Sequence, residues 1–421
     1  MTSVDGLVER NILSVTLSRC AESPVVLLEG PRTVGKSTLL RALAAQLGGE
    51  VLDLDDIAVR DAVAADPATM IGGPGPVLLD EYQHAPIVLD AIKARLNRSS
   101  EPGQFVLTGS ARHESLPRAA QALTGRLQRL PVLPLTQAEQ HGCGRGLLAR
   151  LLREPAEVVA GPPSSTTRDD YVERILRGGL PLALAAPTPA ARGRWIDSYL
   201  RLSLERDVQE LSRIRQAHAL PAVLERLAGQ TAQVLNGTAV AADLGVDAKT
   251  GRDYVRLLES VFLVRLLPAW DRTLTKRTTA KPKVHLVDSA IAARLLRITA
   301  AQLTRRDPVA LTEFGHLLES FVIGELLGHV AWTDGIVGVG HWRTKDRHEV
   351  DLVIESEGGR VLAFEIKAST RAAGEDFRGL RALRERLGHE FLAGFVLYTG
   401  GRSFSIDDRL HALPIDTLWS R

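Results

Sequence analysis

The chain has 421 residues, of which 45% are hydrophobic and 24% are charged. This composition excludes a disordered chain, and the length exceeds what one hydrophobic core usually organises, so we expect two or three domains. The net charge of +2 excludes a general attraction to nucleic acid, which would need a local basic patch.

Two further features concern the compartment. Cys20 and Cys143 are too far apart for a metal-binding pair and too few for a disulfide scaffold, which favours the reducing cytoplasm. The first residues, MTSVDGLVERN, lack the apolar core of a signal peptide. No run of about 18 apolar residues occurs, so we predict no membrane partner.

The first third of the chain alternates short apolar runs with helix-like stretches. Four runs are predicted to be buried strands, at residues 25–29, 51–54, 77–80 and 105–108. A fifth, at residues 127–133, is weakened by Pro131. Helical stretches, such as residues 37–47 and 87–96, lie between the strands. This alternation predicts a parallel sheet with helices on both faces.

Residues 30–37 read GPRTVGKS and match the phosphate-loop pattern G-x-x-x-x-G-K-[ST]. The glycines let backbone N–H groups face an anion, and the following helix adds its positive end. We expect Lys36 to reach the β- and γ-phosphates of ATP, and the Ser37 hydroxyl to ligate Mg²⁺. A glycine-rich turn without a ligand is the alternative. The predicted nucleotide-binding residues are Gly30, Pro31, Arg32, Thr33, Val34, Gly35, Lys36, Ser37 and Thr38.

Two acids follow the third strand, in the sequence PVLLDEY. We expect Asp80 to hold Mg²⁺, directly or through water, and Glu81 to be the general base that orients or deprotonates the attacking water. A strand that ends in two solvated acids is the simpler alternative. The phosphate loop upstream favours the catalytic interpretation.

The fourth strand continues into VLTGS, which fits the strand between the two Walker strands in the additional-strand class of ATPases. Thr108 or Ser110 would then contact the γ-phosphate or the water, and an ordinary strand end is the alternative. Arg126, in LTGRL, is a candidate catalytic arginine finger or sensor, with a helix-capping arginine as the alternative. A finger acting in trans would require a homo-oligomer. No N-K-x-D motif for guanine occurs, so ATP is preferred to GTP.

After about residue 153 the composition changes. Residues 154–167 are rich in Pro, Ser and Thr and predict a linker or long loop, and residues 170–296 are mostly helical by periodicity. Residues 238–258 fit a helix-turn-helix with its turn at Gly245, and residues 262–268 fit part of a wing.

The second helix of this unit is basic. It carries Lys249, Arg252 and Arg256, and residues 249–283 contain nine basic and three acidic residues. This local excess predicts contact with the phosphates of DNA or RNA. A packing unit with a solvated charged face and a surface for a protein partner are the alternatives.

The last part of the chain carries an acid–acid–lysine set, with Asp351 in HEVDLVIE and Glu365 and Lys367 in VLAFEIKAS. This is D…E-x-K, the signature of PD-(D/E)xK nucleases. Glu365 and Lys367 point to the same face of an extended strand, and Asp351 on the neighbouring strand can join them. The carboxylates would hold a divalent cation while the lysine activates water. A preceding helix offers Glu319 as a further acid, with Glu325 as a weaker alternative.

The D…E-x-K motif alone is weak, because acids and lysines alternate on many exposed strands. Here the flanking residues 352–354 and 362–364 are apolar, so the charges punctuate buried strands, and burying charges without a role is costly. A nuclease-like fold without nuclease activity remains the alternative.

Together these segments resemble a bacterial family that joins an AAA-type P-loop ATPase to a C-terminal domain of unknown function. The resemblance covers nearly the whole chain. It implies a restriction-endonuclease-like, PD-(D/E)xK fold for the C-terminal domain. Thr33 and Val34 depart from the commoner loop residues, with no expected loss of binding. The matching segments are GPRTVGKS, LLDEYQ, VLTGS, LTGRL, RGGLPLAL, YLRLSLERDVQEL, HLVDSAIAARLL, FGHLLESFVIGEL and the D…E-x-K strands.

We therefore predict an α/β protein in three parts. Residues 1–152 form an additional-strand P-loop ATPase domain, residues 169–300 a helical, winged-helix domain, and residues 301–421 a nuclease-like α/β domain. The predicted function is that of a cytoplasmic Mg²⁺-dependent ATP hydrolase that acts as a nucleotide-driven switch on nucleic acid. The alternatives are a regulatory ATPase with a protein partner and an inactive nuclease-like domain, and an ATP-regulated metal-dependent nuclease.

Overall fold

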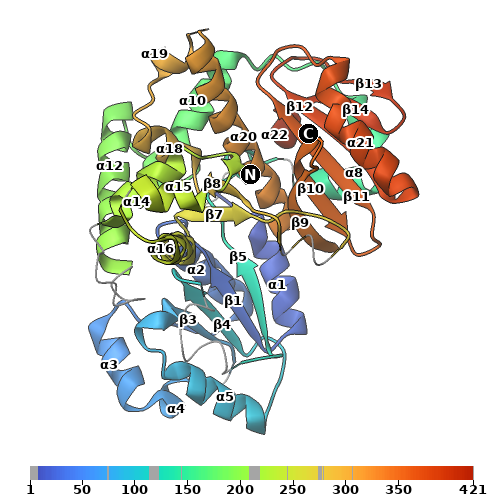
Figure 1. The fold of residues 1–421 in the computed structure, drawn as a ribbon. Helices are drawn as coiled ribbons and strands as arrows, with labels where there is room; N and C mark the ends of the chain where they lie inside the picture. Colours follow the sequence, from blue (N-terminus) through green and yellow to red (C-terminus); the bar gives the residue numbers. More distant parts are fainter. Residues whose placement is uncertain are drawn as a thin grey trace.

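The structure of the protein is a computed structural model that describes residues 8–73, 75–112, 123–143, 145–207, 219–243, 245–273, 277, 279–305 and 307–420. Figure 1 shows three parts. An N-terminal part, in blue and cyan, surrounds a parallel sheet, and a middle part, in green and yellow, consists mainly of helices. A C-terminal part, in orange and red, contains a second large sheet.

The N-terminal part is built on five parallel strands in the order β2-β3-β4-β1-β5. The strands are β1 (Val25–Glu29), β2 (Glu50–Asp53), β3 (Val77–Asp80), β4 (Phe105–Gly109) and β5 (Leu127–Pro131). Because β4 lies between β1 and β3, the inserted strand predicted from VLTGS is confirmed. β5 is an edge strand and ends at Pro131, which has no N–H to donate.

Helices cover both faces of this sheet. They are α1 (Ile12–Glu22), α2 (Lys36–Leu47), α3 (Ile57–Ala65), α4 (Pro67–Met70), the 3₁₀ helix η1 (Tyr82–His84) and α5 (Val88–Arg98). Val25 and Leu27 of β1 belong to the core beneath α5, whereas Val26 and Leu28 belong to the core beneath α1 and α2. Since both faces are covered, the strands β1, β3 and β4 are apolar except at their carboxyl ends, which made them readable in the sequence.

The middle part is mainly helical and contains a small antiparallel sheet in the order β6-β8-β7. Its strands are β6 (Gln233–Val234), β7 (Val264–Leu267) and β8 (Lys283–Leu286). Its helices are α7 (Gln137–His141), α8 (Leu147–Arg153), α9 (Pro155–Val159), α10 (Arg168–Arg177), α11 (Pro181–Leu184), α12 (Pro189–Leu202), the π-helical turn η3 (Ser203–Asp207), α14 (Leu220–Ala228), α15 (Gly237–Asp243), α16 (Ala248–Ser260), α18 (Ser289–Leu295) and α19 (Ala300–Leu303). α9 therefore lies within the segment predicted to be a linker.

The helix-turn-helix pattern corresponds to α15 and α16, which are joined through Gly245 with a φ of 63°. The Asp247 side chain caps α16 by accepting from the backbone N–H groups of Lys249 and Thr250 at 2.8 and 3.0 Å. Tyr254 and Leu258 are buried. The opposite face of α16 is exposed.

The C-terminal part is a six-stranded mixed sheet between two helices, in the order β13-β14-β12-β11-β10-β9. Its strands are β9 (Ile336–Arg343), β10 (Glu349–Ser356), β11 (Val361–Lys367), β12 (Phe391–Tyr398), β13 (Phe404–Asp407) and β14 (Leu410–Pro414). Its helices are α20 (Pro308–Ala331), the 3₁₀ helices η5 (Gly374–Phe377) and η6 (Gly388–Glu390), α21 (Arg378–Leu387) and α22 (Thr417–Ser420). α20 covers one face of the sheet and α21 covers the other.

One hydrophobic core runs through the middle and C-terminal parts. It contains Leu147 and Leu151 of α8, Leu258 of α16, Phe321 of α20 and Phe364 of β11. Between Leu317 and His329 α20 is buried around most of its circumference, as a helix that packs against neighbours on several sides must be. In Figure 1 it lies between the helices of the middle part and the second sheet. The middle and C-terminal parts share this core, and so does α8, most of which falls inside the predicted ATPase domain of residues 1–152. The division into three domains therefore stays a prediction.

No helix in the described stretches of the chain is both long enough and apolar enough to cross a membrane.

Candidate functional site

The phosphate loop joins β1 to α2. Gly35, with a φ of 98°, and Thr33, with a φ of 59°, adopt the left-handed backbone that turns the chain sharply into the helix. Gly30 has a different role, because a Cβ there would lie 2.1 Å from the carbonyl oxygen of Val132. Only glycine fits where the loop passes the chain that follows β5.

The Lys36 side chain folds back over this loop. Its Nζ donates to the carbonyl oxygens of Gly30 and Pro31 at 3.1 and 3.0 Å and lies 3.5 Å from Oε1 of Glu81. Burial lowers the pKa of Lys36, while the Glu81 and Asp80 carboxylates counteract this. The ammonium is therefore held beside the loop by groups that phosphate oxygens can replace.

Arg10 is a residue of this site that the sequence analysis missed. Its guanidinium donates to the carbonyl oxygens of Val34 and Leu133, both at 2.7 Å, and its Nε pairs with Glu139 at 2.9 Å. It therefore ties the phosphate loop to the chain after β5. No local pattern marks a single arginine in an N-terminal segment for this role.

The two acids after β3 are buried beside the loop. The hydroxyls of Ser37 and Thr108 both donate to the Asp80 carboxylate, and Thr108 Oγ1 also accepts from the backbone N–H of Glu81 at 2.9 Å. Burial raises the pKa of Asp80, and the two hydroxyl donors oppose this shift. The structure thus brings together the hydroxyl and the carboxylate that the sequence analysis assigned to Mg²⁺.

Glu81 points toward Lys36 and is held by Gln83. The Gln83 amide donates to Glu81 Oε2 and lies 3.0 Å from Ser110 Oγ. Burial would raise the pKa of Glu81, but the Lys36 ammonium, aided by hydrogen bonds from Gln83 and Ser110, lowers it to about 2. Glu81 is therefore a carboxylate at neutral pH. Gln83 was not singled out in the sequence, although it lies only two residues beyond the acid.

Arg126 lies away from the phosphate loop. It directly precedes β5, whose residue Leu127 pairs with Val25 at the start of β1, whereas the phosphate loop follows the other end of β1. Five strand residues span about 16 Å. Arg126 is half-buried and donates to Asn97 Oδ1 at 2.7 Å. The structure does not place Arg126 near the phosphate loop of its own chain. A role as an arginine finger in trans therefore stays a prediction.

Arg112, which follows β4, joins the N-terminal part to α16. Its backbone N–H and its Nε donate to the carbonyl oxygens of Ser260 and Glu259 at 2.9 and 3.1 Å, and its Nη2 lies 3.2 Å from the Glu259 carboxylate. These acceptors are at the carboxyl end of α16, where a cation is favourable. β4, which carries Thr108 and continues into Ser110, is thus connected to the helix-turn-helix.

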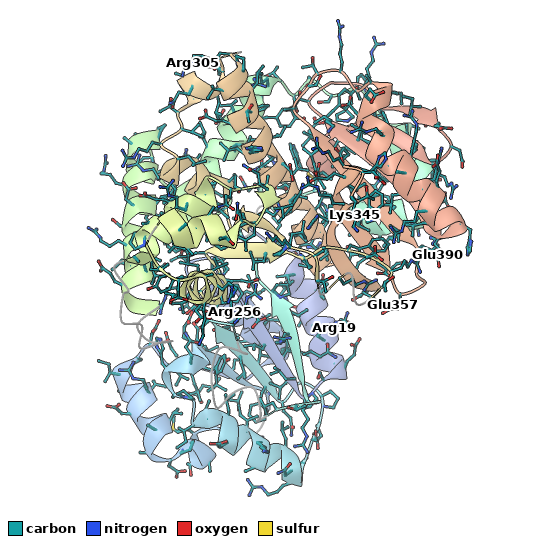
Figure 2. The ribbon with its side chains drawn as sticks, in the orientation of Figure 1. Arg19, Arg256, Arg305, Lys345, Glu357 and Glu390 are labelled. Atoms are coloured by element: carbon teal, nitrogen blue, oxygen red, sulfur yellow. The ribbon has the colours of Figure 1, made fainter. Side chains whose placement is uncertain are left out.

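The basic residues between positions 249 and 283 do not form one surface, which corrects the expectation drawn from their number. Lys249, Arg252 and Arg256 are exposed on α16, and Figure 2 shows Arg256 where α16 approaches the N-terminal part. Four others are engaged within the protein, because three of them pair with opposite charges far away in sequence and the fourth, Arg265, is half-buried. These four are Arg265, Arg272, Arg277 and Lys283.

The acid–acid–lysine set surrounds one cavity of about 470 Å³ in the C-terminal part. Asp351 of β10, Glu365 and Lys367 of β11, and Glu319 of α20 all line it. Asp351 Oδ2 accepts from the backbone N–H of Ile366 at 2.9 Å, and Glu365 pairs with Lys367 at 2.7 Å. The structure therefore brings together the four residues that the sequence analysis grouped here.

A bulge in β10 lies beside this cavity. The pairing of β10 with β9 shifts by one residue between Val350 and Val353. Val350 and Val353 consequently face the core under α21, and Leu352 faces the core under α20. Bulges redirect side chains in this way near binding sites. Here it leaves Asp351 at the cavity next to a buried leucine.

The centre of the acidic cluster is occupied by Lys283 of β8, which the sequence analysis counted as a surface charge. Its Nζ lies 2.8 Å from each of three carboxylates, those of Glu319, Glu349 and Asp351. Burial opposes the charge, but the three carboxylates raise the pKa of Lys283 well above its usual value. Glu349 was readable from the period-two pattern with Asp351, whereas nothing local marked Lys283.

The acidic cluster does not fit a divalent cation in this arrangement, because a lysine ammonium already takes the place between the carboxylates. Among the described residues, no group of three or more His, Cys, Asp or Glu side chains is placed to hold a metal ion. The contact between the Ser37 hydroxyl and Asp80, by contrast, provides the oxygen donors that Mg²⁺ prefers.

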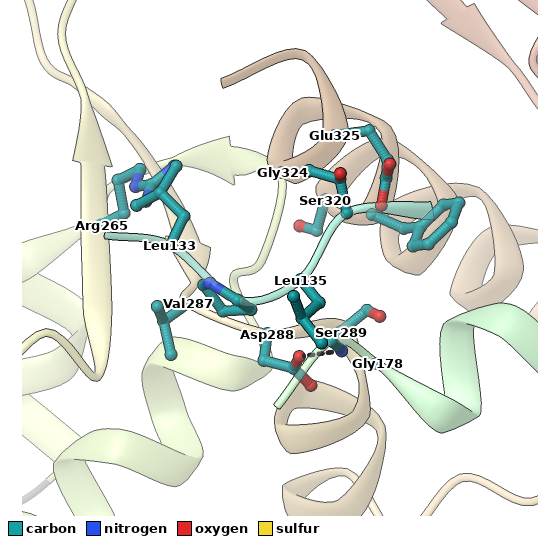
Figure 3. A pocket seen from close by; sticks show the side chains of 14 residues that line it. Leu133, Leu135, Gly178, Arg265, Val287, Asp288, Ser289, Ser320, Gly324 and Glu325 are labelled. Carbon is teal, nitrogen blue, oxygen red and sulfur yellow. Dashed lines mark hydrogen bonds between the residues drawn. The ribbon is translucent and has the colours of Figure 1, made fainter. Parts of the chain in front are cut away.

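Glu325, the weaker alternative for the nuclease-like site, lies elsewhere, which corrects that interpretation. It accepts from the backbone N–H of Gln137 at 2.8 Å. It lines a small cavity of about 40 Å³ together with Asp288 and Gly178 (Figure 3). Burial raises the pKa of Glu325 to about 8. Six residues beyond Glu319 on a straight helix, its side chain faces the junction between the three parts.

Comparison with known protein families divides the chain in three. Residues 22–141 match the model of an AAA domain family. Residues 168–302 and 314–418 match two families described only as domains of unknown function, DUF8612 and DUF4143.

Relatives and solved structures resemble the chain over long stretches. Uncharacterized proteins of Mycobacterium bovis and Mycobacterium tuberculosis are each 28% identical over 415 residues, covering 98% of this chain and 85% of the relative. A Walker-type ATPase of Pyrococcus abyssi is 15% identical, covers 70% of this chain and 98% of its own, and has a TM-score of 0.42. A signal-transduction ATPase with numerous domains from Pyrococcus horikoshii is 11% identical and covers 76% of this chain and 48% of its own, with a TM-score of 0.22.

The family match over residues 22–141 coincides with the five-stranded parallel sheet, the inserted strand and the phosphate loop. This part of the protein has a P-loop NTPase fold and is similar to the AAA domain family.

Proposed function

We propose that the protein is a Mg²⁺-dependent ATP hydrolase that works as a nucleotide-driven switch. The observation that carries this proposal is the convergence of Lys36, Ser37, Asp80, Glu81 and Thr108 at the carboxyl ends of β1, β3 and β4. These are the residue types that phosphoryl transfer to water requires, in mutual contact.

Each residue has a distinct task in this proposal. The loop N–H groups and Lys36 bind the phosphates, and Ser37 and Asp80 hold Mg²⁺, which would neutralise the charge that develops on them. Glu81 orients the attacking water. Phosphate oxygens compete with the carbonyl groups of Gly30 and Pro31 for Lys36, so ATP binding also withdraws the ammonium from Glu81. The carboxylate becomes available to water only once the nucleotide is bound.

The switch would be transmitted through β4. Thr108, which donates to Asp80, and Arg112, which grips the end of α16, are only four residues apart. A change around Asp80 and Glu81 therefore has a short and rigid connection to the helix-turn-helix.

Nucleotide binding and hydrolysis test the first half of the proposal. Lys36→Ala is expected to abolish binding of a fluorescent ATP analogue, measured by anisotropy with Mg²⁺, because it removes the ammonium that lies over the loop. Lys93→Ala, an exposed lysine of α5 in the same domain, is the matched control and should bind like wild type. Equal binding by both variants would contradict the proposal.

Arg112→Ala tests the transmission. We expect ATP to bind and be hydrolysed, while the nucleotide-dependent change in hydrogen exchange of α16 is lost, because the two side-chain contacts to Glu259 are removed and only the backbone hydrogen bond to Ser260 stays. Arg98→Ala, an exposed arginine of α5, is the control. An Arg112→Ala protein whose α16 still responds to ATP like wild type would rule out this route.

The partner we propose for the switch is nucleic acid, bound by the exposed basic face of α16. Phosphate contacts made by Lys249, Arg252 and Arg256 would give an affinity that falls steeply with salt. A Lys249→Glu/Arg252→Glu variant should lose binding to labelled DNA and RNA duplexes and single strands. Lys93→Glu/Arg98→Glu carries the same charge change on α5 and should keep it. Absence of binding by wild type at low salt, with or without ATP, would instead favour a protein partner.

An ATP-regulated nuclease is a second candidate, favoured by the shared cavity of Asp351, Glu365 and Lys367. It predicts metal-dependent cleavage that Glu365→Ala and Lys367→Ala abolish while ATP hydrolysis persists. The Lys283 ammonium lies between the carboxylates of that cluster, where a metal ion would have to bind, so this candidate requires Lys283 to move away.

A further inference from the structure

Lys283 is contributed to the C-terminal acidic cluster by a different part of the chain. It begins β8 of the small middle sheet, while its three carboxylate partners come from α20 and β10. Its side chain is only 3% exposed. The contact is therefore a buried ion cluster between the middle part and the C-terminal part.

The arrangement around the ammonium resembles the coordination of a hard cation. Three carboxylate oxygens converge on one Nζ at equal distances of 2.8 Å, and the second oxygen of Asp351 is fixed by the Ile366 N–H. Ca²⁺–O distances are about 2.3–2.6 Å, so the carboxylates would need to move inward by only a few tenths of an ångström to hold such an ion. Oxygen donors of this kind select Ca²⁺, Mg²⁺ or Mn²⁺ rather than softer metals.

A fourth carboxylate beside the ammonium, that of Glu365, has an oxygen that could still accept a ligand. Glu365 lines the same cavity, and its Oε2 is buried without a hydrogen-bond partner among the described residues, while Oε1 pairs with Lys367. An unpaired buried oxygen costs free energy unless something fills that role. The cluster therefore contains more oxygen donors than the lysine uses.

We propose that Lys283 acts as a built-in cation which keeps a divalent-metal site of the C-terminal part closed, and that removing its ammonium opens this site to Ca²⁺ or Mn²⁺. In the closed form the cluster binds no metal ion, so it performs no metal-dependent chemistry. Opening it would require β8 to move away from β10 and α20. The inference is independent of ATP hydrolysis, since it concerns a contact outside the P-loop domain.

The test is metal uptake by a lysine-to-methionine variant of the full chain. Lys283→Met keeps most of the side-chain volume but removes the charge, leaving three carboxylates without their cation. We expect it to bind one Mn²⁺ per chain, detected by electron paramagnetic resonance without nucleotide. Wild type and Lys281→Met, an exposed lysine two residues away, are expected to bind none at this site.

A second substitution identifies the site. In a Lys283→Met/Asp351→Asn protein the extra Mn²⁺ should disappear, and subtracting this signal removes any ion bound at Ser37 and Asp80. A folded Lys283→Met protein that takes up no Asp351-dependent Mn²⁺ would overturn the proposal. So would a wild-type protein that already binds Mn²⁺ in an Asp351-dependent way.

Stability gives an independent measurement in case the single variant folds poorly, because unpaired buried carboxylates are destabilising. Ca²⁺ should raise the melting temperature of Lys283→Met by several degrees and leave wild type and Lys281→Met unchanged. The Lys283→Met/Glu349→Gln protein removes the most exposed of the three acids and so lowers the uncompensated charge. It should still respond to Ca²⁺, and a melting temperature indifferent to Ca²⁺ in both folded variants would refute the proposal.

Discussion

At the residue scale, the backbone of Glu81 has a φ of 52°, in the left-handed region that residues with a side chain rarely adopt. This turn directs the carboxylate from the end of β3 toward Lys36 and Gln83 rather than along the strand. Strain of this kind persists where surrounding contacts enforce it, often at catalytic groups. Here the enforcing contacts are the hydrogen bond from the Glu81 N–H to Thr108 and the grip of Gln83 on the carboxylate.

Glu81→Gln should separate ATP binding from hydrolysis. The amide keeps the shape of the side chain but cannot accept a proton from water, so we expect kcat to fall by about 10²- to 10⁴-fold with nucleotide affinity retained. Steady-state phosphate release and ATP-analogue anisotropy measure the two effects. Glu101→Gln, an exposed glutamate of the same domain, should hydrolyse ATP like wild type. A Glu81→Gln enzyme with wild-type kcat would remove Glu81 from the mechanism.

At the scale of elements, the phosphate loop depends on how closely the chain after β5 passes it. The carbonyl oxygen of Val132 occupies the space that a side chain at Gly30 would need, and Arg10 links both segments. The P-loop is therefore shaped by the edge strand of the sheet as well as by its own glycines.

Gly30→Ala is expected to distort the loop, because its Cβ would meet a backbone oxygen that cannot rotate away. Overpacking of this kind costs about 1–3 kcal/mol in free energy of unfolding. We expect a lower melting temperature and weaker ATP binding together. Gly73→Ala, where a Cβ meets no atom within 4 Å, is the control and should change neither. Unchanged ATP affinity in Gly30→Ala would show that the loop tolerates the shift.

The elements that could be predicted are those whose surroundings the local sequence encodes. β1 and β3 coincide with the predicted runs 25–29 and 77–80. Strands buried on both faces are continuous apolar runs, and in both cases an acidic residue marks the carboxyl end. The predicted set of Asp351, Glu365 and Lys367 could be grouped from strand alternation and hairpin pairing. Lys283 could not, since the contact between β8 and β10 spans 68 residues and depends on the tertiary fold.

At the scale of the whole molecule, the three parts meet around buried polar groups. Gln137 of α7 donates to Glu325 of α20, and Asp288 before α18 accepts from the Gly179 N–H at 2.6 Å. On the outer side, Arg19 of α1, labelled in Figure 2, pairs with Asp334 beyond α20. This pair attaches the N-terminal part to the C-terminal part, as Arg112 attaches it to α16, and Glu325 lines the cavity that it shares with Asp288 (Figure 3).

The junction should make stability depend on pH. The pKa of Glu325 is raised from 4.5 to about 8 by burial, so its contribution to stability is fully present below pH 4.5 and is lost as the pH rises to about 8. Each unit of pKa shift corresponds to roughly 1.4 kcal/mol. Glu325→Gln should therefore show a smaller fall in melting temperature between pH 5 and pH 8 than wild type. Glu313→Gln, near the start of the same helix, is the control, and identical pH profiles for wild type and Glu325→Gln would contradict the prediction.

α20 has a consequence for how such a chain can be inherited. It packs against α10 and α18 on one side and against the strands of the last sheet on the other, so its sequence must fit both neighbours. A recombination event that imported only the final 120 or so residues from a distant relative would bring a helix fitted to a foreign partner. The regions at residues 168–302 and 314–418 should consequently be inherited together rather than exchanged separately.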